Sequence, residues 1–248
     1  GAPPEDRAAP DGSLDVSALA RLCEARGEDL TLEGLGPGPP LRLRQLPLSS
    51  YHAVEHKGGA LWPSSEVLAH FLALSPELVA WLAGASGGQR RRVCELGCGA
   101  AALPGLVATR LGAAVTLTDL PEVVAVARRN AKANGLHVEA CSLDWESVAS
   151  PSDSGTFDAI LAADVLYDPA LHEPLLVTID RISAPGAGVL IAVQLRLNGD
   201  GGFFSKLLPS RGWAARSLDL AAVFAAMGWN PTFEENFELW ECWRLADG

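Results

Sequence analysis

Short apolar runs alternate with longer helical segments from residue 92 onward. The runs are rich in Val, Leu, Ile and Ala, as is typical of strands buried on both faces of a sheet. Pro at the starts and Gly at the ends of the intervening segments are typical of helices. This alternation predicts βαβ units in a mostly parallel α/β sheet with helices on both faces, followed by a late antiparallel strand. The predicted strands are Val93–Leu96, Ala114–Thr118, Val138–Leu143, Phe157–Ala163, Val189–Val193 and Phe233–Arg244, and the predicted helices are Ala101–Leu111, Pro121–Asn134, a segment from Asp168 to Ser183, and Leu218–Met227.

The chain before residue 61 has a different pattern of apolar and polar residues. Apolar residues at helical spacing from Val16 to Cys23 predict a helix, and alternation over Leu41–Arg44 predicts a strand. Two further helices are predicted up to Leu74 and from Ser75 to Gly84. We therefore expect a helical and β extension over residues 1–60 and one domain over residues 61–248. Residues 197–212 match no element and are interpreted as an insertion near a site.

Composition and charge narrow the class of protein. Hydrophobic residues make up 48% of the 248 residues and charged residues 20%, which is typical of a globular chain. Asp and Glu outnumber Lys and Arg by 30 to 19, giving a net charge of −11. Such a chain is a poor partner for nucleic acid phosphates. The charge either attracts a basic partner or serves solubility, and the sequence leaves these two explanations open.

The cysteines and the hydropathy point to a compartment. Five cysteines occur without a C-x-x-C pair, so neither a disulfide framework nor a metal site is expected. Unpaired cysteines favour a reducing compartment, the cytoplasm or also the nucleus. No apolar run approaches the roughly 18 residues of a membrane span, and the first residues show no signal-peptide pattern.

A glycine loop follows the first strand of the predicted sheet. Gly97 and Gly99 allow a tight turn and a close backbone approach to a ligand. Asp119 ends the next strand, and its distance in sequence from Gly99 is compatible with NAD binding, in which Asp119 would hold the ribose hydroxyls. Glu95, however, precedes the loop, and a carboxylate there suits the cationic groups of S-adenosylmethionine better than an anionic pyrophosphate. The structural alternative for the two glycines is a plain strand-to-helix turn, and the alternative for Glu95 is an ordinary surface charge at the end of a strand.

Two more polar elements follow later strands. Asp144 and Trp145 come after the third strand, at the edge where open α/β sheets bind ligands, although Trp145 could also be a core residue. Asp164 and Tyr167 are three positions apart after the fourth strand. The alternative for Tyr167 is a packed aromatic residue, while Asp168 is interpreted as a helix cap.

Taken in order, these elements resemble one family. The set is similar to the eukaryotic methyltransferase-like protein-lysine methyltransferases that carry a D-x-x-Y motif, most of all to the elongation-factor-2 enzymes. The resemblance covers about residues 60–195 and implies the Rossmann-like seven-stranded class I methyltransferase fold. The motifs that carry it are Leu61-Trp62-Pro63, Glu95-Leu96-Gly97-Cys98-Gly99, Leu117-Thr118-Asp119, Leu143-Asp144-Trp145 and Ala163-Asp164-Val165-Leu166-Tyr167.

The resemblance also implies a cofactor, site roles and a partner. The cofactor would be S-adenosylmethionine, released as S-adenosylhomocysteine. Asp164 and Tyr167 would position a lysine of a protein such as a translation factor or chaperone, presented on a basic surface to a monomeric enzyme. No nucleic acid, membrane or metal would take part. The implied cofactor-binding residues are Trp62, Glu95, Gly97, Cys98, Gly99, Asp119, Asp144, Trp145 and Ala163.

One position departs from the family pattern. Ala101 replaces a common third glycine, which predicts slightly altered loop packing if its φ is helical. Arginine methylation, small-molecule methylation and a non-catalytic interaction module are the alternatives that the residues leave open. An NAD-dependent oxidoreductase is also compatible with the glycine loop, although no second catalytic domain is apparent.

Overall fold

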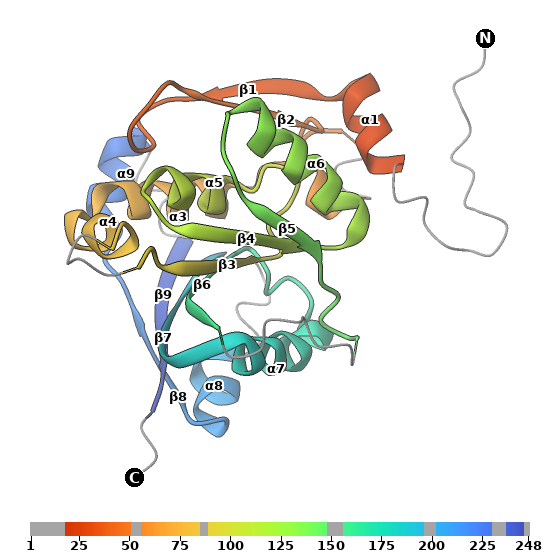
Figure 1. Cartoon of the computed structure of the whole chain (residues 1–248). Helices are drawn as coiled ribbons and strands as arrows, with labels where there is room; N and C mark the ends of the chain where they lie inside the picture. The colour runs from red at the N-terminus through yellow and green to blue at the C-terminus, as the bar shows by residue number, and fades with distance from the viewer. Residues whose placement is uncertain are drawn as a thin grey trace, which may run out of the picture.

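A mixed β-sheet forms the centre of the protein. The computed structural model describes residues 18–50, 56–84, 89–147, 156–195, 202–229 and 237–245. Within these residues, seven strands pair in the order β5-β4-β3-β6-β7-β9-β8, and β9 runs antiparallel to the other six (Figure 1). The Rossmann-like α/β fold with a late antiparallel strand is confirmed. The strands are β3 (Arg92–Leu96), β4 (Ala114–Asp119), β5 (Glu139–Ser142), β6 (Phe157–Ala163), β7 (Ser183–Gln194), β8 (Trp213–Ser217) and β9 (Phe237–Arg244).

Two apolar layers cover the sheet, one on each face. Successive residues of one strand enter opposite layers, as Ile160 and Leu161 of β6 do. One layer joins the sheet to α3, α5, α6 and α9, and the other joins it to α7 and α8 (Figure 1). The helices are α3 (Pro63–Leu74), α4 (Pro76–Leu82), α5 (Leu103–Arg110), α6 (Pro121–Ala133), α7 (His172–Ile182), α8 (Leu208–Ser210) and α9 (Ala221–Met227).

Several element boundaries differ from the sequence prediction. Helix α5 begins at Leu103 rather than at residue 101, because Ala102 has a left-handed φ of 48° that no helical residue adopts. Strand β8 was not predicted, and it completes the sheet beside β9. The described part of the unassigned segment, from residue 202, forms a π-helical turn, η3 (Phe203–Leu207). Its two phenylalanines lie buried in the layer with α7.

A small hairpin precedes the main sheet. Helix α1 (Ala18–Arg26) leads into β1 (Glu28–Leu32), an unpredicted strand that pairs antiparallel with β2 (Leu41–Gln45). The hairpin and α1 lie along α6 (Figure 1). Leu41 and Leu43 are buried in the same apolar layer as α3 and α5. The domain division at residue 60 stays a prediction.

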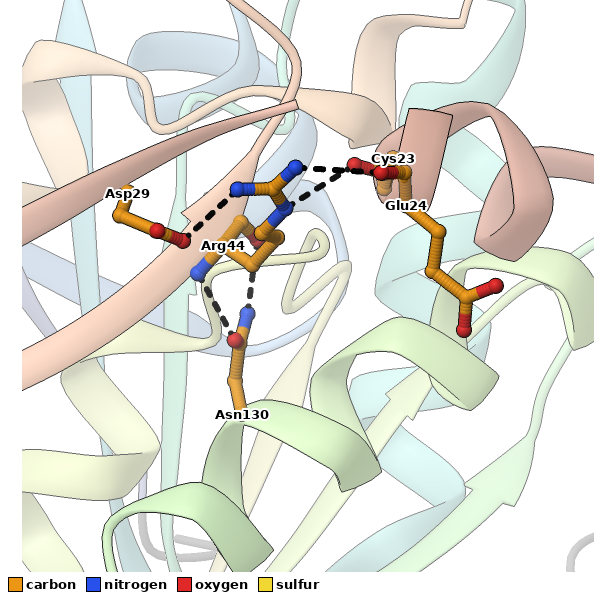
Figure 2. Close-up of polar contacts among 5 residues, drawn as sticks. All are labelled: Cys23, Glu24, Asp29, Arg44 and Asn130. Atoms are coloured by element: carbon orange, nitrogen blue, oxygen red, sulfur yellow. Dashed lines mark hydrogen bonds and ion pairs between the residues drawn. The ribbon is translucent and has the colours of Figure 1, made fainter. Parts of the chain in front are cut away.

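Arg44 of β2 ties these elements together. Its guanidinium donates to the carbonyl oxygens of Cys23 and Glu24, both at 3.1 Å, and to the Asp29 carboxylate at 3.0 Å (Figure 2). Its backbone N–H and carbonyl bond to the side-chain amide of Asn130 in α6 at 2.8 and 3.0 Å. One residue thus fastens α1 and both hairpin strands to α6.

Among the described residues, no helix has the length and apolar character to span a membrane.

Candidate active site

A cavity of about 360 Å³ opens at the carboxyl ends of β3, β4 and β6. This is the edge at which open α/β sheets bind ligands. Nearly all the residues assigned to a site from the sequence lie around it, although they come from five separate segments. Those that line the cavity are Trp62, Gly97, Cys98, Gly99, Asp119, Asp144, Trp145, Ala163, Asp164 and Tyr167.

The first two loop glycines satisfy a backbone requirement. Gly97 and Gly99 have φ values of +62° and +64°, which favour glycine strongly. A Cβ atom at Gly97 would lie 3.0 Å from Val165 Cγ1 and 3.3 Å from the Trp145 ring. The absence of this atom lets Trp145 pack against the loop and form one wall of the cavity. Buried Cys98 lies between the two glycines, and its N–H donates to the Thr118 carbonyl at 3.0 Å.

The third loop position accommodates alanine. Ala101 is not among the described residues with positive φ, so a side chain is tolerated there. The left-handed conformation lies one residue later, at Ala102. This conformation is unusual for alanine, and the backbone reverses here to start α5.

Asp119 links β4 to the glycine loop. Its carboxylate accepts the Gly99 N–H at 2.8 Å on one oxygen and the Leu120 N–H at 2.7 Å on the other. Burial raises the pKa of Asp119 to about 6, although both N–H groups oppose the shift. Each oxygen keeps a lone pair, so the carboxylate can accept two hydroxyl groups of a ligand.

Glu95 has a different environment from the one its sequence position implied. Its side chain is only 1% exposed and is not among the residues that line the cavity. The carboxyl group accepts the Gly105 N–H of α5 at 2.9 Å. A Cβ atom at Gly105 would lie 2.5 Å from that oxygen, so Gly105 makes room for it. Burial raises the pKa of Glu95 well above its ordinary value. In this structure Glu95 supports the start of α5 rather than facing a ligand.

Asp164 and Tyr167 lie on the β6 side of the cavity. Asp164 has a left-handed φ of +57°, a region that Asp tolerates better than most residues. Its N–H donates to the Ala192 carbonyl at 2.8 Å, which holds the turn against β7. Tyr167 is 46% exposed, and burial, with the nearby Asp119 and Asp168 carboxylates, raises the pKa of its phenol. Asp168 accepts the Ala170 N–H at 3.0 Å and so caps the 3₁₀ turn Pro169–Leu171, rather than α7 itself, which begins at His172.

One wall of the cavity was not predicted from the sequence. Lys57 and Gly58 belong to the 3₁₀ turn η1 (Lys57–Gly59) and line the cavity beside Trp62. The Trp62 indole N–H donates to the Lys57 carbonyl at 2.7 Å, and the Ala100 N–H donates to the Gly58 carbonyl at 2.6 Å. Neither helical nor strand periodicity marks this turn, so only a glycine pair could have drawn attention to it.

The side chains around the cavity fit a cationic cofactor. Carboxylates of Asp119, Asp144, Glu146 and Asp164 line it, together with one ammonium group, that of Lys57. Such a wall suits a sulfonium and an ammonium group and disfavours a pyrophosphate. Trp145 offers an aromatic face and Asp119 offers acceptors for a pair of hydroxyls. These features fit S-adenosylmethionine better than NAD.

Comparisons with known proteins identify the family and agree with the fold. The sequence profile of a lysine methyltransferase family matches residues 45–209, more than half of the chain. The chain therefore belongs to the lysine methyltransferase family. The crystal structure of PH0793 from Pyrococcus horikoshii has the same fold, with a TM-score of 0.52 at 12% identity, over 88% of this chain and 72% of that one.

Two curated relatives illustrate the range of this similarity. The mouse protein-lysine methyltransferase METTL21E is 30% identical over 185 residues, which cover 67% of this chain and 72% of the relative. The histone-arginine methyltransferase METTL23 of Xenopus laevis is 34% identical over 128 residues, which cover 49% of this chain and 50% of the relative. The chain spans about two thirds of the length of the METTL21E relatives that it matches.

Proposed function

We propose that this protein transfers a methyl group from S-adenosylmethionine to a lysine side chain of another protein. The observation that carries the proposal is that Asp164 and Tyr167 line the same cavity as the glycine loop and Asp119. A methyl acceptor held by the first pair would therefore lie beside a cofactor held by the second group. Family membership supports the same reaction.

The chain's own residues would bind and orient the cofactor. Asp119 would accept the ribose hydroxyls, Trp145 would contact the adenine face, and Trp62 would close the cavity from the α3 side. The backbone at Gly97, Gly99 and Ala163 would line the methionine part. When bound, the cofactor supplies an electrophilic methyl group on a sulfonium.

The acceptor amine must arrive neutral, whereas an exposed lysine has a pKa of about 10.4. Partial desolvation in the cavity and a neighbouring cationic sulfonium both lower that pKa. Asp164 would orient the amine through a hydrogen bond, and Tyr167 would form the wall of the channel. Methyl transfer is an in-line displacement, so positioning of this kind supplies most of the catalysis.

Charge and cysteine usage support a proposal for the partner and the compartment. A net charge of −11 favours a basic protein surface that presents the lysine, as on a translation factor or chaperone. We propose a monomeric enzyme of the cytoplasm, and of the nucleus as well. Arginine is the second candidate acceptor, because carboxylates also bind guanidinium well and because METTL23 is a relative.

The test joins binding to transfer. S-adenosylmethionine and S-adenosylhomocysteine should raise the melting temperature, and NAD should not. With methyl-labelled cofactor, a cell extract should acquire label that mass spectrometry places on lysine. Asp164→Asn keeps the shape and tolerates the left-handed φ, so it should bind cofactor normally but transfer much more slowly. Label on arginine, or full activity in Asp164→Asn, would contradict the proposal.

A further inference from the structure

One lysine of this chain lies at the candidate acceptor position. Lys57 lines the cavity with Asp119 and Asp164, and its Nζ lies 4.2 Å from the centroid of the Tyr167 ring. This contact is a cation–π interaction with the tyrosine of the D-x-x-Y pair. The ammonium of Lys57 thus lies against the aromatic ring that the proposed function gives to an incoming lysine.

The backbone that carries Lys57 is anchored to the cofactor side of the cavity. The Lys57 carbonyl accepts the Trp62 indole N–H, and the next carbonyl, that of Gly58, accepts the Ala100 N–H of the glycine loop. The Gly58 position also contacts α6, because a Cβ atom there would lie 2.8 Å from Val123 Cγ2. Lys57 is therefore held beside the site by an ordered turn, while its own side chain is exposed.

We infer that Lys57 is a self-methylation site of this protein. The inference rests on the proposed function. In the reaction, Lys57 first loses a proton to solvent. Its neutral Nζ then forms a bond to the methyl carbon while the bond between that carbon and the sulfonium sulfur breaks. The sulfur keeps the electron pair as a thioether, so S-adenosylhomocysteine leaves and Lys57 becomes a methylammonium.

The other lysines of the sequence provide internal controls. Lys132 lies in the last turn of α6, beside a second cavity at the amino ends of β3 and β4, the opposite edge of the sheet. Lys206 lies in η3, and neither residue is among those that line the candidate site. If exposure alone decided which lysine is methylated, all of these lysines would react. If position at the cavity decides it, only Lys57 reacts.

The experiment incubates the full chain with deuterated-methyl S-adenosylmethionine and no other protein. Peptide mass spectrometry should find the label on Lys57, with at least tenfold less on Lys132 and Lys206. The labelled fraction per minute should not change over a hundredfold range of protein concentration, because the acceptor lysine and the active site belong to one molecule. Lys57→Arg should lose the label, whereas Lys132→Arg and Lys206→Arg should keep it.

A parallel reaction with cell extract separates two kinds of failure. If extract proteins are methylated on lysine while Lys57 stays unmodified, the inference is wrong and the proposed function stands. Equal label on Lys132 and Lys206, or a rate per molecule that rises with protein concentration, would overturn it too. If cofactor binds but neither extract proteins nor Lys57 are methylated, both the inference and the proposed function fail.

Discussion

The side-chain amide of Asn130 donates a hydrogen bond of 2.7 Å to the carbonyl of Ala100 in the glycine loop. The same amide bonds to the backbone of Arg44, which in turn holds α1 and the β1–β2 hairpin (Figure 2). Asn130 is buried, and its side chain joins Arg44 of the hairpin directly to the loop proposed to hold the cofactor. We therefore expect the hairpin to stabilise the loop.

Asn130→Ala should lower both stability and cofactor affinity. Loss of a buried, fully paired amide costs about 1–3 kcal/mol, because its partners stay buried. If placing the loop for binding then costs about 1 kcal/mol, the cofactor binds several-fold more weakly. Denaturant unfolding and calorimetric titration with S-adenosylhomocysteine measure the two effects.

Asn134 supplies the matched control one helical turn away. Its amide bonds to the backbone N–H and carbonyl of Arg42 at 2.8 and 2.7 Å, but to no glycine-loop residue. Asn134→Ala should therefore cost stability and leave affinity unchanged. Equal losses of affinity in the two variants would show that the Ala100 bond does not position the loop.

Gly97→Ala should abolish cofactor binding. Alanine in the left-handed region costs about 1–2 kcal/mol, and the new methyl group would also press against Val165 and Trp145. Gly135→Ala has the same conformational cost at a φ of +66°, with no atom within 4 Å of the new Cβ. Thermal shift with S-adenosylhomocysteine should therefore disappear in Gly97→Ala and persist in Gly135→Ala. Retained binding in Gly97→Ala would mean that Trp145 does not pack on the loop in the complex.

Cofactor affinity should rise with pH around the pKa of Asp119. Below about 6 this carboxyl is protonated and offers one acceptor fewer to ribose hydroxyls. Above that pH both oxygens accept, so the affinity increases and levels off near neutrality. Titrations between pH 5 and pH 8 check this, and Asp119→Asn should bind weakly with no such step. An unchanged pH profile in Asp119→Asn would assign the step to another group.

The raised pKa of Asp119 gives folding stability the opposite pH dependence from cofactor affinity. The folded pKa of Asp119 lies above its ordinary value of 3.8, so between about 3.8 and 6 the folded state binds more protons than the unfolded state. The contribution of Asp119 to stability therefore falls as pH rises through that window. Without cofactor, Asp119→Asn should unfold with a weaker pH dependence than the natural protein over this range.

Glu95→Gln distinguishes a supporting role from a cofactor contact. Glutamine keeps an acceptor for the Gly105 N–H and removes a carboxyl group whose pKa burial raises. Above pH 4.5 the Glu95 carboxyl ionises in the unfolded chain, whereas burial opposes its ionisation in the folded protein. The stability of the wild-type protein therefore falls as pH rises. Glu95→Gln has no such loss, so its melting temperature at pH 7 should be higher than that of the wild type. Cofactor affinity should be unchanged. A large loss of affinity would return Glu95 to the cofactor-binding role inferred from the sequence.

The sequence was a reliable guide where the signal lies within a few neighbouring residues. Apolar runs and Pro or Gly boundaries predicted β3, β4 and β6 and the helices between them, because burial on both faces imposes a local pattern. Strands β1 and β8 were missed, and both lie at the edges of their sheets and are only partly buried. Their pairing with β2 and β9 depends on partners elsewhere in the chain.

The site divides in the same way. By itself, the sequence determined the strand-to-helix order, the two loop glycines, and the acidic and aromatic residues at strand ends that resemble a methyltransferase. Their assigned roles stay predictions until binding and transfer are measured. Only the tertiary structure decided that Glu95 supports α5, that Asn130 supports the loop, and that Lys57 faces Tyr167. These contacts join residues 10, 30 and 110 positions apart. No local pattern encodes such distances, because packing of the whole sheet and its helices brings those residues together.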